Sequence, residues 1–264
     1  MRTIDSLINV AGDQLYVQLT EKDNSKPTIV FLHDSLGCTA LWRNFPHKLA
    51  EATGCNFLIY DRKGYGRSDP MQTILRTQGY LEKEAEVLHD LLAQLGLTKV
   101  ILFGHSDGGS IALIAAARYP LIMEAIIAEA AHIFVEPETV TGIRAAVERY
   151  QHTDLGERLS KYHGEKSNAV FHAWTETWLS DAYQSWNIES YLPRIVCPTL
   201  IIQGEEDEYG TIKQVEGIAR KISGRGDVFL LPETGHTPHK EAPVQVLEKA
   251  RQFIEVVCRG RHGQ

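Results

Sequence analysis

Short apolar runs separated by amphipathic stretches are the main pattern along this chain. Strands that are covered on both faces of a sheet read as continuous apolar runs, because neither face meets water. Residues 15–19 instead alternate apolar and polar side chains, which is typical of a half-buried strand and indicates an antiparallel edge of the sheet. The continuous runs lie at residues 28–32, 57–60, 100–103, 125–128, 199–202 and 228–231.

Helical spacing fills most of the intervals between these runs. Apolar residues from Leu81 to Leu95 recur at spacings of 4, 3, 4 and 3 and draw one stripe along a predicted helix. A last helix is predicted after Pro243, with an apolar face that runs from Leu247 to Val257. Strands that alternate with helices predict an α/β fold, with a mostly parallel central sheet and helices on both of its faces.

The alternation stops between residues 132 and 191. Successive helical patterns occupy this segment, and no strand pattern separates them. Pro193 and Pro198 then mark the return to the sheet, since proline interrupts helices. We therefore predict one core domain, residues 1–131 and 192–264, into which residues 132–191 are inserted as a helical cap.

The length and composition fit this architecture. A chain of 264 residues can bury a core and carry an inserted cap, and 43% hydrophobic with 23% charged residues is typical of a globular protein. The formal net charge of −7, without a run of basic residues, offers no electrostatic attraction to nucleic acid or to an anionic membrane surface. We expect a small-molecule substrate, no nucleic-acid or membrane partner, and a monomer or homodimer.

Targeting and metal-binding patterns are absent from the sequence. The first residues lack the apolar stretch of a signal peptide, and no run approaches membrane-spanning length. The four cysteines, at positions 38, 55, 197 and 258, match no zinc-binding spacing and are too few to stabilise a chain of this length with disulfide bonds. We expect a cytoplasmic protein with buried, reduced thiols and no cofactor.

A sharp turn between a strand and a helix is indicated around Ser106. The sequence Gly104-His105-Ser106-Asp107-Gly108 follows an apolar run and precedes the helical run at residues 111–115. In a nucleophile elbow the serine backbone is strained, and small residues two positions before and after the serine avoid clashes. The helix that follows places its positive end at the hydroxyl, where negative charge is stabilised. Ser106 is the predicted nucleophile; an incidental serine in a glycine-rich turn is the alternative.

Two loops downstream supply the partners that a serine nucleophile needs, a general base and an acid that orients it. Asp207 follows the apolar run at 199–202 and His236 follows the run at 228–231, which gives the chain order serine, acid, histidine. Catalytic groups of open parallel sheets gather at the carboxyl ends of strands. Asp207 is therefore the predicted acid and His236 the predicted base. The competitors for the base are the histidines at 33, 105, 132 and 239.

A tetrahedral intermediate also needs two backbone N–H donors. The residue after the nucleophile, Asp107, supplies one of them. The other is expected in residues 33–37, which follow the first continuous apolar run and are called the oxyanion loop below. The Ser35 amide is the preferred donor and the Leu36 amide the alternative, and the Leu36 side chain is also a candidate substrate contact.

These segments together resemble the α/β-hydrolase superfamily from about residue 15 to residue 257. The sequence from Ser106 to Gly109, with the helix end at Arg118-Tyr119-Pro120, resembles the biphenyl hydrolase-like, or valacyclovir hydrolase, branch. Ser35-Leu36-Gly37 is similar to the enol-lactonases of aromatic degradation. One position departs from the family, which usually has glycine where this chain has Asp34. The segments that carry the resemblance are 33–37, 61–68, 104–109, 204–207 and 235–236.

The resemblance, together with a serine at the elbow, implies acyl transfer, whereas related dehalogenases and epoxide hydrolases carry an aspartate there. We expect hydrolysis of a small carboxylic ester through an acyl-enzyme, with an α-amino acid ester as one form, since the Asp107 carboxylate can bind an ammonium group. One alternative is an enol-lactone or carbon–carbon bond hydrolase, which the acidic site loops disfavour because such substrates are anionic. The alternative of another class is a non-catalytic binding protein on the same fold.

The cap and one further loop supply candidate substrate contacts. Phe171, Trp174 and Trp178 are spaced 3 and 4 apart and share one helical face. This face forms either the roof of an apolar pocket or the packing face of the cap. Glu129 and His132 follow the run at 125–128, so they are expected near the same sheet edge, either as substrate contacts or as ordinary loop residues.

Overall fold

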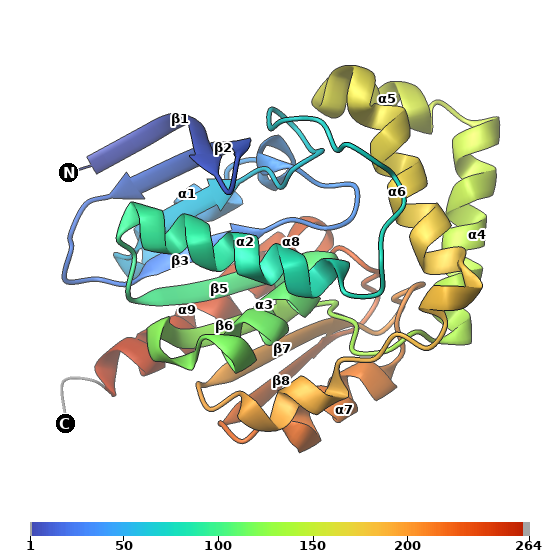
Figure 1. The fold of residues 1–264 in the computed structure, drawn as a ribbon. Helices are drawn as coiled ribbons and strands as arrows, with labels where there is room; N and C mark the ends of the chain where they lie inside the picture. The colour runs from blue at the N-terminus through green and yellow to red at the C-terminus, as the bar shows by residue number, and fades with distance from the viewer. Residues whose placement is uncertain (1, 261–264) are drawn as a thin grey trace.

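An eight-stranded sheet forms the centre of the molecule in the computed structural model, which describes residues 2–260 (Figure 1). The strand order is β1-β2-β4-β3-β5-β6-β7-β8. β2 pairs antiparallel with β1 and with β4, and the other neighbours pair in parallel. The strands are β1 Arg2–Val10, β2 Asp13–Glu21, β3 Thr28–Leu32, β4 Asn56–Tyr60, β5 Val100–His105, β6 Met123–Glu129, β7 Thr199–Gly204 and β8 Gly226–Leu231.

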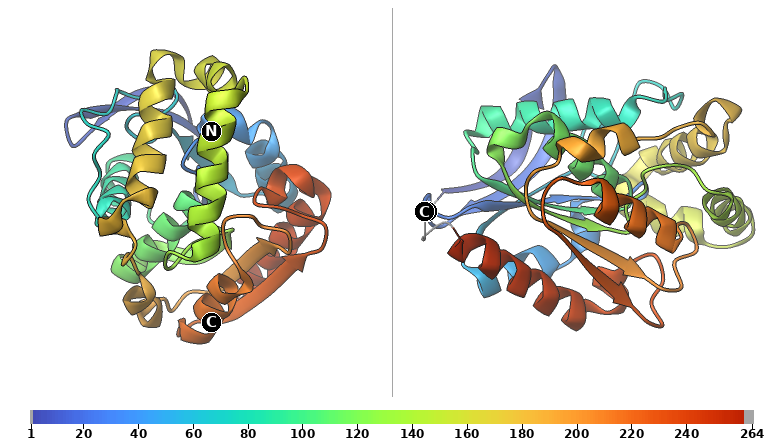
Figure 2. Two further views of the ribbon diagram at one scale, coloured as in Figure 1. Left: turned by 90° about the vertical axis from the view of Figure 1, so that its right-hand side faces the viewer. Right: turned by 90° about the horizontal axis from the view of Figure 1, so that it is seen from below.

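Helices cover both faces of the sheet, which confirms the predicted fold class (Figure 2, right). α2 and α3 pack together on one face, and α1 and α9 pack together on the other. Each pair closes its own cluster of buried apolar side chains against the sheet. The helices of the core are α1 Phe45–Thr53, α2 Tyr80–Leu95, α3 Asp107–Arg118, α7 Ile212–Lys221, α8 Pro238–Glu241 and α9 Pro243–Arg259.

The N-terminal hairpin departs from the sequence-based expectation. Residues 15–19 lie in β2, which is an inner strand because β1 pairs with it along nine residues and forms the edge. Only Val10 of β1 is buried. The strand conformation of β1 is therefore set by hydrogen bonding to β2, and a pattern that reports burial does not detect it.

Three helices fill the segment between β6 and β7 that was predicted as a cap. They are α4 Pro137–His152, α5 Leu155–His163 and α6 Ser167–Leu179, and α6 packs against both others. Figure 2 (left) views the molecule from the side on which these helices lie. The boundaries of the cap stay a prediction. Within residues 2–260, no helix is both long and apolar enough to cross a membrane.

Candidate active site

Ser106 lies at the tight turn between β5 and α3. Its φ of 55° and ψ of −118° are unusual for a residue other than glycine, so the backbone is strained at this position. Two glycines permit the turn. A Cβ on Gly104 would lie 2.1 Å from the Gly108 carbonyl oxygen, and a Cβ on Gly108 would lie 2.0 Å from the Leu32 carbonyl oxygen. Larger residues at either position would push α3 away from the strand ends.

The three predicted catalytic side chains meet beside this turn. His236 Nε2 lies 2.9 Å from Ser106 Oγ, and His236 Nδ1 lies 2.8 and 2.9 Å from the two carboxylate oxygens of Asp207. Asp207 also accepts hydrogen bonds from the Tyr209 N–H at 2.8 Å and from Gln203 Nε2 at 2.7 Å. The carboxylate is thus fixed on both sides, and it fixes the imidazole in turn.

Charge around the imidazole sets its affinity for a proton. Burial by itself lowers the pKa of His236, but the Asp207 carboxylate and its hydrogen bond outweigh burial and raise that pKa. Burial by itself raises the pKa of Asp207, but the nearby His236 imidazole outweighs burial and lowers that pKa. For His105 burial prevails and lowers the pKa to about 4. Of these two imidazoles, only His236 therefore has the charge environment of a general base.

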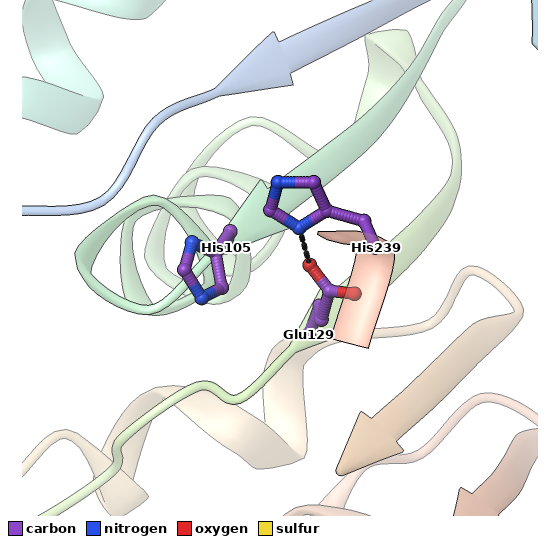
Figure 3. Close-up of side chains that lie close together, drawn as sticks. All are labelled: His105, Glu129 and His239. Carbon is purple, nitrogen blue, oxygen red and sulfur yellow. Dashed lines mark hydrogen bonds and ion pairs between the residues drawn. The ribbon is translucent and has the colours of Figure 1, made fainter. Parts of the chain in front are cut away.

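The competing histidines have other hydrogen-bond partners. His132 Nε2 bonds the Tyr209 carbonyl oxygen at 3.0 Å. Figure 3 shows the remaining cluster, in which His239 Nδ1 lies 2.6 Å from Glu129 Oε2 and His105 lies beside that pair. His105 Nε2 donates to the carbonyl oxygen of His236 at 2.8 Å. The cluster therefore supports the loop that carries His236.

The same cluster has the composition of a metal site, since ligand atoms of His105, Glu129 and His239 lie within 4.8 Å of one another. Two of those atoms, His239 Nδ1 and Glu129 Oε2, already form a short ion pair with each other. His105 is bound to a backbone carbonyl through one ring nitrogen. The contacts present are accounted for by hydrogen bonding, and no metal is needed to hold the three side chains together.

A cavity of about 180 Å³ opens beside Ser106 between the core and the cap. Sites for drug-sized ligands typically have volumes of about 300 Å³ or more, so the volume of this cavity favours a small substrate. Three carboxylates border the cavity, and no lysine or arginine among residues 2–260 does. The lining comprises Asp34, Ser35, Leu36, Ser106, Asp107, His132, Thr139, Ile143, Trp174, Trp178, Glu208, Tyr209, His236 and Thr237. All of the predicted substrate contacts, Leu36, Asp107, His132, Trp174 and Trp178, are among them.

The aromatic residues of α6 divide between the cavity wall and the packing of the cap. Trp174 and Trp178 border the cavity. Phe171 instead stacks on Tyr150 inside the cap, with ring centroids 3.8 Å apart. Trp178 also donates a hydrogen bond from Nε1 to the Tyr80 hydroxyl at 3.0 Å, so the roof is attached to α2.

Aspartate at position 34 does not require a strained backbone in the oxyanion loop. Asp34 does not adopt a positive φ, so aspartate fits there without strain. Ser35 and Asp107 both border the cavity, and no backbone carbonyl of residues 2–260 accepts a hydrogen bond from either amide. Both amides are thus available to a ligand. Leu36, the alternative donor, accepts a hydrogen bond from His163 of the cap at its carbonyl oxygen, at 3.0 Å.

The Asp107 side chain has partners that sequence reasoning missed. It is 1% exposed, accepts a hydrogen bond from the Tyr80 hydroxyl at 3.0 Å, and lies 3.7 Å from Arg62 Nη2. The signal for Arg62 was its place in the segment 61–68, but nothing in the sequence indicated its partner. A carboxylate beside a developing oxyanion is unfavourable unless a cation offsets it. Here the protein itself supplies that cation.

Known proteins match the chain over most of its length. Residues 29–250 match the model of the alpha/beta hydrolase family. Serine hydrolase BPHL from Homo sapiens is 29% identical over 207 residues, which cover 75% of this chain and 69% of that protein. A proline iminopeptidase from Saccharolobus solfataricus is 25% identical over 291 aligned positions, which cover 94% of this chain and 91% of that protein. The crystal structure of the enol-lactonase from Burkholderia xenovorans LB400 has a TM-score of 0.75 at 19% identity, over 94% of this chain and 99% of that one.

Proposed function

Because this chain belongs to the alpha/beta hydrolase family, we propose that it is a serine hydrolase that cleaves small carboxylic esters through an acyl-enzyme on Ser106. The observation that carries the proposal is the continuous hydrogen-bond chain from Asp207 through His236 to Ser106 Oγ. Ser106 borders a small cavity that can hold a substrate. A cytoplasmic location and a monomeric or homodimeric state, both expected from the sequence, stay predictions.

The geometry supports a two-step reaction. His236 Nε2 accepts the Ser106 proton while Oγ attacks the ester carbonyl carbon, and the Ser35 and Asp107 amides donate to the resulting oxyanion. Collapse of the tetrahedral intermediate breaks the carbon–oxygen bond, and His236 gives its proton to the leaving alcohol. A water molecule, deprotonated by His236, then attacks the acyl carbon. Collapse of this second tetrahedral intermediate breaks the bond between the acyl carbon and Oγ, His236 returns the proton to Ser106 Oγ, and the carboxylic acid is released. Asp207 orients the imidazole and stabilises its charged form without taking the proton.

Substitution of Ser106 tests the proposal directly. Ser106→Ala and His236→Ala should each lower esterase turnover by about 10⁴-fold, because the triad acts as a unit. Wild type should accept a fluorophosphonate probe, and Ser106→Ala should not. Ser160→Ala, at an exposed serine of α5, is the matched control and should leave both readouts unchanged. Wild-type protein that neither labels nor hydrolyses any ester of a p-nitrophenyl panel would instead favour a non-catalytic binding protein.

The charge of the cavity favours neutral or cationic esters over anionic lactones. Asp34, Asp107 and Glu208 border it, and the part of the chain that the structure describes places no compensating lysine or arginine in the lining. An α-amino acid ester is therefore the second candidate, and its ammonium group would lie near one of these carboxylates. Because Asp107 already faces Arg62 and Tyr80, its capacity to bind a cation is smaller than that of an unpaired carboxylate.

A pair of matched substrates decides between the two forms of ester. The measurement compares kcat/KM for a valine ester with that for its N-acetylated counterpart, in wild type, Asp107→Ala and Glu208→Gln. Recognition of the amine by Asp107 predicts a wild-type preference for the free amine of about 10- to 150-fold, lost in Asp107→Ala. Loss in Glu208→Gln alone would assign the contact to Glu208. A wild type without any preference would be a general carboxylesterase, and turnover of lactones alone would favour the enol-lactone alternative.

A further inference from the structure

Arg62 contacts both halves of the oxyanion site although it does not border the cavity. It follows β4 and is 1% exposed. Its Nη2 donates to the Asp34 carbonyl oxygen at 2.8 Å and to the His33 carbonyl oxygen at 3.3 Å. The same nitrogen lies 3.7 Å from Asp107 Oδ2. One guanidinium group therefore joins the oxyanion loop to the residue that carries the second amide.

The Asp34 carbonyl belongs to the same peptide unit as the Ser35 N–H. No peptide bond in residues 2–260 is cis, so the carbonyl and the N–H of this unit point in opposite directions. Three donors hold the carbonyl: Arg62 Nη2 at 2.8 Å, His33 Nδ1 at 2.8 Å and the Gly37 N–H at 3.2 Å. The orientation of the Ser35 N–H is thus set from the far side of its peptide, because a flip would break all three bonds.

Arg62 also determines which nitrogen of His33 carries the proton. The Arg62 backbone N–H donates to His33 Nε2 at 3.1 Å, so that nitrogen keeps its lone pair. The proton of the neutral ring is therefore on Nδ1, where it faces the Asp34 carbonyl oxygen. Burial and then the Arg62 charge lower the pKa of His33 well below its usual value, which keeps the ring neutral. Backbone and side chain of Arg62 hence act on the same peptide.

The second half of the oxyanion site has an electrostatic problem that Arg62 removes. The Asp107 carboxylate lies on the residue whose N–H is to stabilise negative charge, and its own charge opposes that. The Tyr65 ring packs on the Arg62 guanidinium, with the ring centroid 4.7 Å from Cζ, and holds it opposite the Asp107 carboxylate. The position of the Arg62 cation is thus fixed before any ligand binds. A fixed, buried cation needs no reorganisation when the oxyanion forms, and this is the condition for effective electrostatic stabilisation.

We propose that Arg62 is a positioning residue that aims the Ser35 amide and cancels the Asp107 charge, so that both oxyanion donors are organised before the substrate binds. The inference rests on the proposed function. Arg62 touches no ligand, and its effect is on the tetrahedral intermediate, where the oxyanion exists. Removing it should therefore lower kcat and leave KM nearly unchanged.

The test compares Asp107→Asn with the double variant Arg62→Gln/Asp107→Asn. The Asn background avoids an uncompensated buried carboxylate, which would destabilise the fold by itself. It also leaves no Asp107 charge to cancel, so this comparison isolates the aiming of the Ser35 amide. With p-nitrophenyl acetate, the double variant should lose about 100-fold in kcat relative to Asp107→Asn, with KM changed by less than about 3-fold. Affinity for a trifluoromethyl ketone, which forms a tetrahedral oxyanion adduct on serine, should fall in parallel. Affinity for a planar amide analogue of the substrate should not.

Arg76→Gln is the matched control. Arg76 belongs to the same group of side chains, since it donates to the Tyr65 hydroxyl at 2.8 Å and faces the Tyr80 ring, but it makes no contact with the oxyanion loop. It should lower thermal stability without the selective loss of kcat. If the double variant does not fold, Arg62→Lys keeps a cation opposite Asp107 but loses the planar fork, and the same split between kcat and KM is expected.

The proposal is overturned if either variant of Arg62 keeps kcat within about 3-fold of its parent, or if the planar and the tetrahedral ligands lose affinity equally. These outcomes differ from a failure of the proposed function. Wild type without fluorophosphonate labelling at Ser106 would remove the serine mechanism and the inference with it. A wild type that labels normally, beside an Arg62 variant with undiminished kcat, would remove the inference alone.

Discussion

Single neighbours determine where the protons lie at the active site. The His33 imidazole is buried and that of His236 is 13% exposed; a backbone N–H faces the first ring and a carboxylate faces the second. As a result, the pKa of His33 is lowered and the pKa of His236 is raised. The same residue type is thus a fixed neutral hydrogen-bond donor in one loop and a proton acceptor in the other.

Asp207→Asn should change the pH dependence of catalysis as well as its rate. The base works when neutral, so activity falls as the pH drops through the raised pKa of His236. In the Asn variant burial remains while the carboxylate is lost, and the pKa of His236 should fall. The acid limb of the kcat/KM profile should therefore move to lower pH, at a turnover reduced by less than in His236→Ala. Glu206→Gln, at an exposed neighbour in the same loop, is the control; a larger loss there would transfer the acid role to Glu206.

The residues that could be predicted are those with a local signature. Ser106 follows the end of β5 directly, and Asp207 and His236 lie in the loops that begin at the ends of β7 and β8, so the strands bring all three to one edge of the sheet. The contacts of Arg62 with Asp34 and of Tyr80 with Asp107 join residues 28 and 27 positions apart, in segments that pack together only in the folded chain. No spacing rule connects such pairs, and the functional partners of Arg62 and Tyr80 were therefore not predictable.

At the level of elements, α5 attaches the cap to the oxyanion loop and to the segment 61–68. His163, at the end of α5, accepts a hydrogen bond from the Gly66 N–H at Nδ1, 3.0 Å away, and donates from Nε2 to the Leu36 carbonyl oxygen. The roof helix α6 is attached separately, through Trp178 and Tyr80. Trp174 borders the cavity, and its ring packs edge-on against the rings of Phe171 and Tyr209.

Trp174→Leu should therefore change acyl-chain selectivity without altering the chemistry. A smaller side chain enlarges the cavity at the roof, so kcat/KM for hexanoate esters should rise relative to that for acetate esters, while the acetate value itself changes little. Phe171→Leu is the matched control on the same helix. Because Phe171 stacks on Tyr150 and does not border the cavity, it should lower stability and leave selectivity unchanged. Equal changes on all esters in Trp174→Leu would contradict a roof role.

Elements with a buried face were predictable, and an element held by its partner was not. The apolar runs marked β3 to β8. Most residues of β3 to β7 are buried, and β8, at the edge of the sheet, buries Leu231 and partly buries Phe229 and Leu230 beside it. β1 has nine residues and one buried side chain, so its pattern resembles that of a polar loop. Its conformation follows from the register with β2, from Arg2 opposite Glu21 to Val10 opposite Asp13. Such pairing is a property of two segments together.

For the molecule as a whole, buried histidines couple stability to pH. Burial leads the causes that lower the pKa of four of them from 6.5, and for His105 the lowered pKa is about 4. The unfolded chain takes up these protons near its ordinary pKa, whereas the folded chain does not, so acidification favours unfolding. His236 acts in the opposite sense, since its raised pKa stabilises the folded state at acid pH and that contribution is lost as the pH rises. The four are His33, His105, His132 and His163.

The free energy of unfolding should therefore decrease as the pH falls from 6.5 toward about 4, because the four histidines with a lowered pKa outweigh the one with a raised pKa. Each unmatched proton contributes about 1.4 kcal/mol per pH unit. Urea unfolding at a series of pH values measures the slope. His163→Gln removes one of the four groups while its amide can still accept from Gly66 and donate to Leu36, so the slope should become shallower by at most one proton. A stability that stays constant across this interval would mean that the folded protein protonates these histidines as readily as the unfolded chain does, and that their hydrogen bonds do not require the neutral ring.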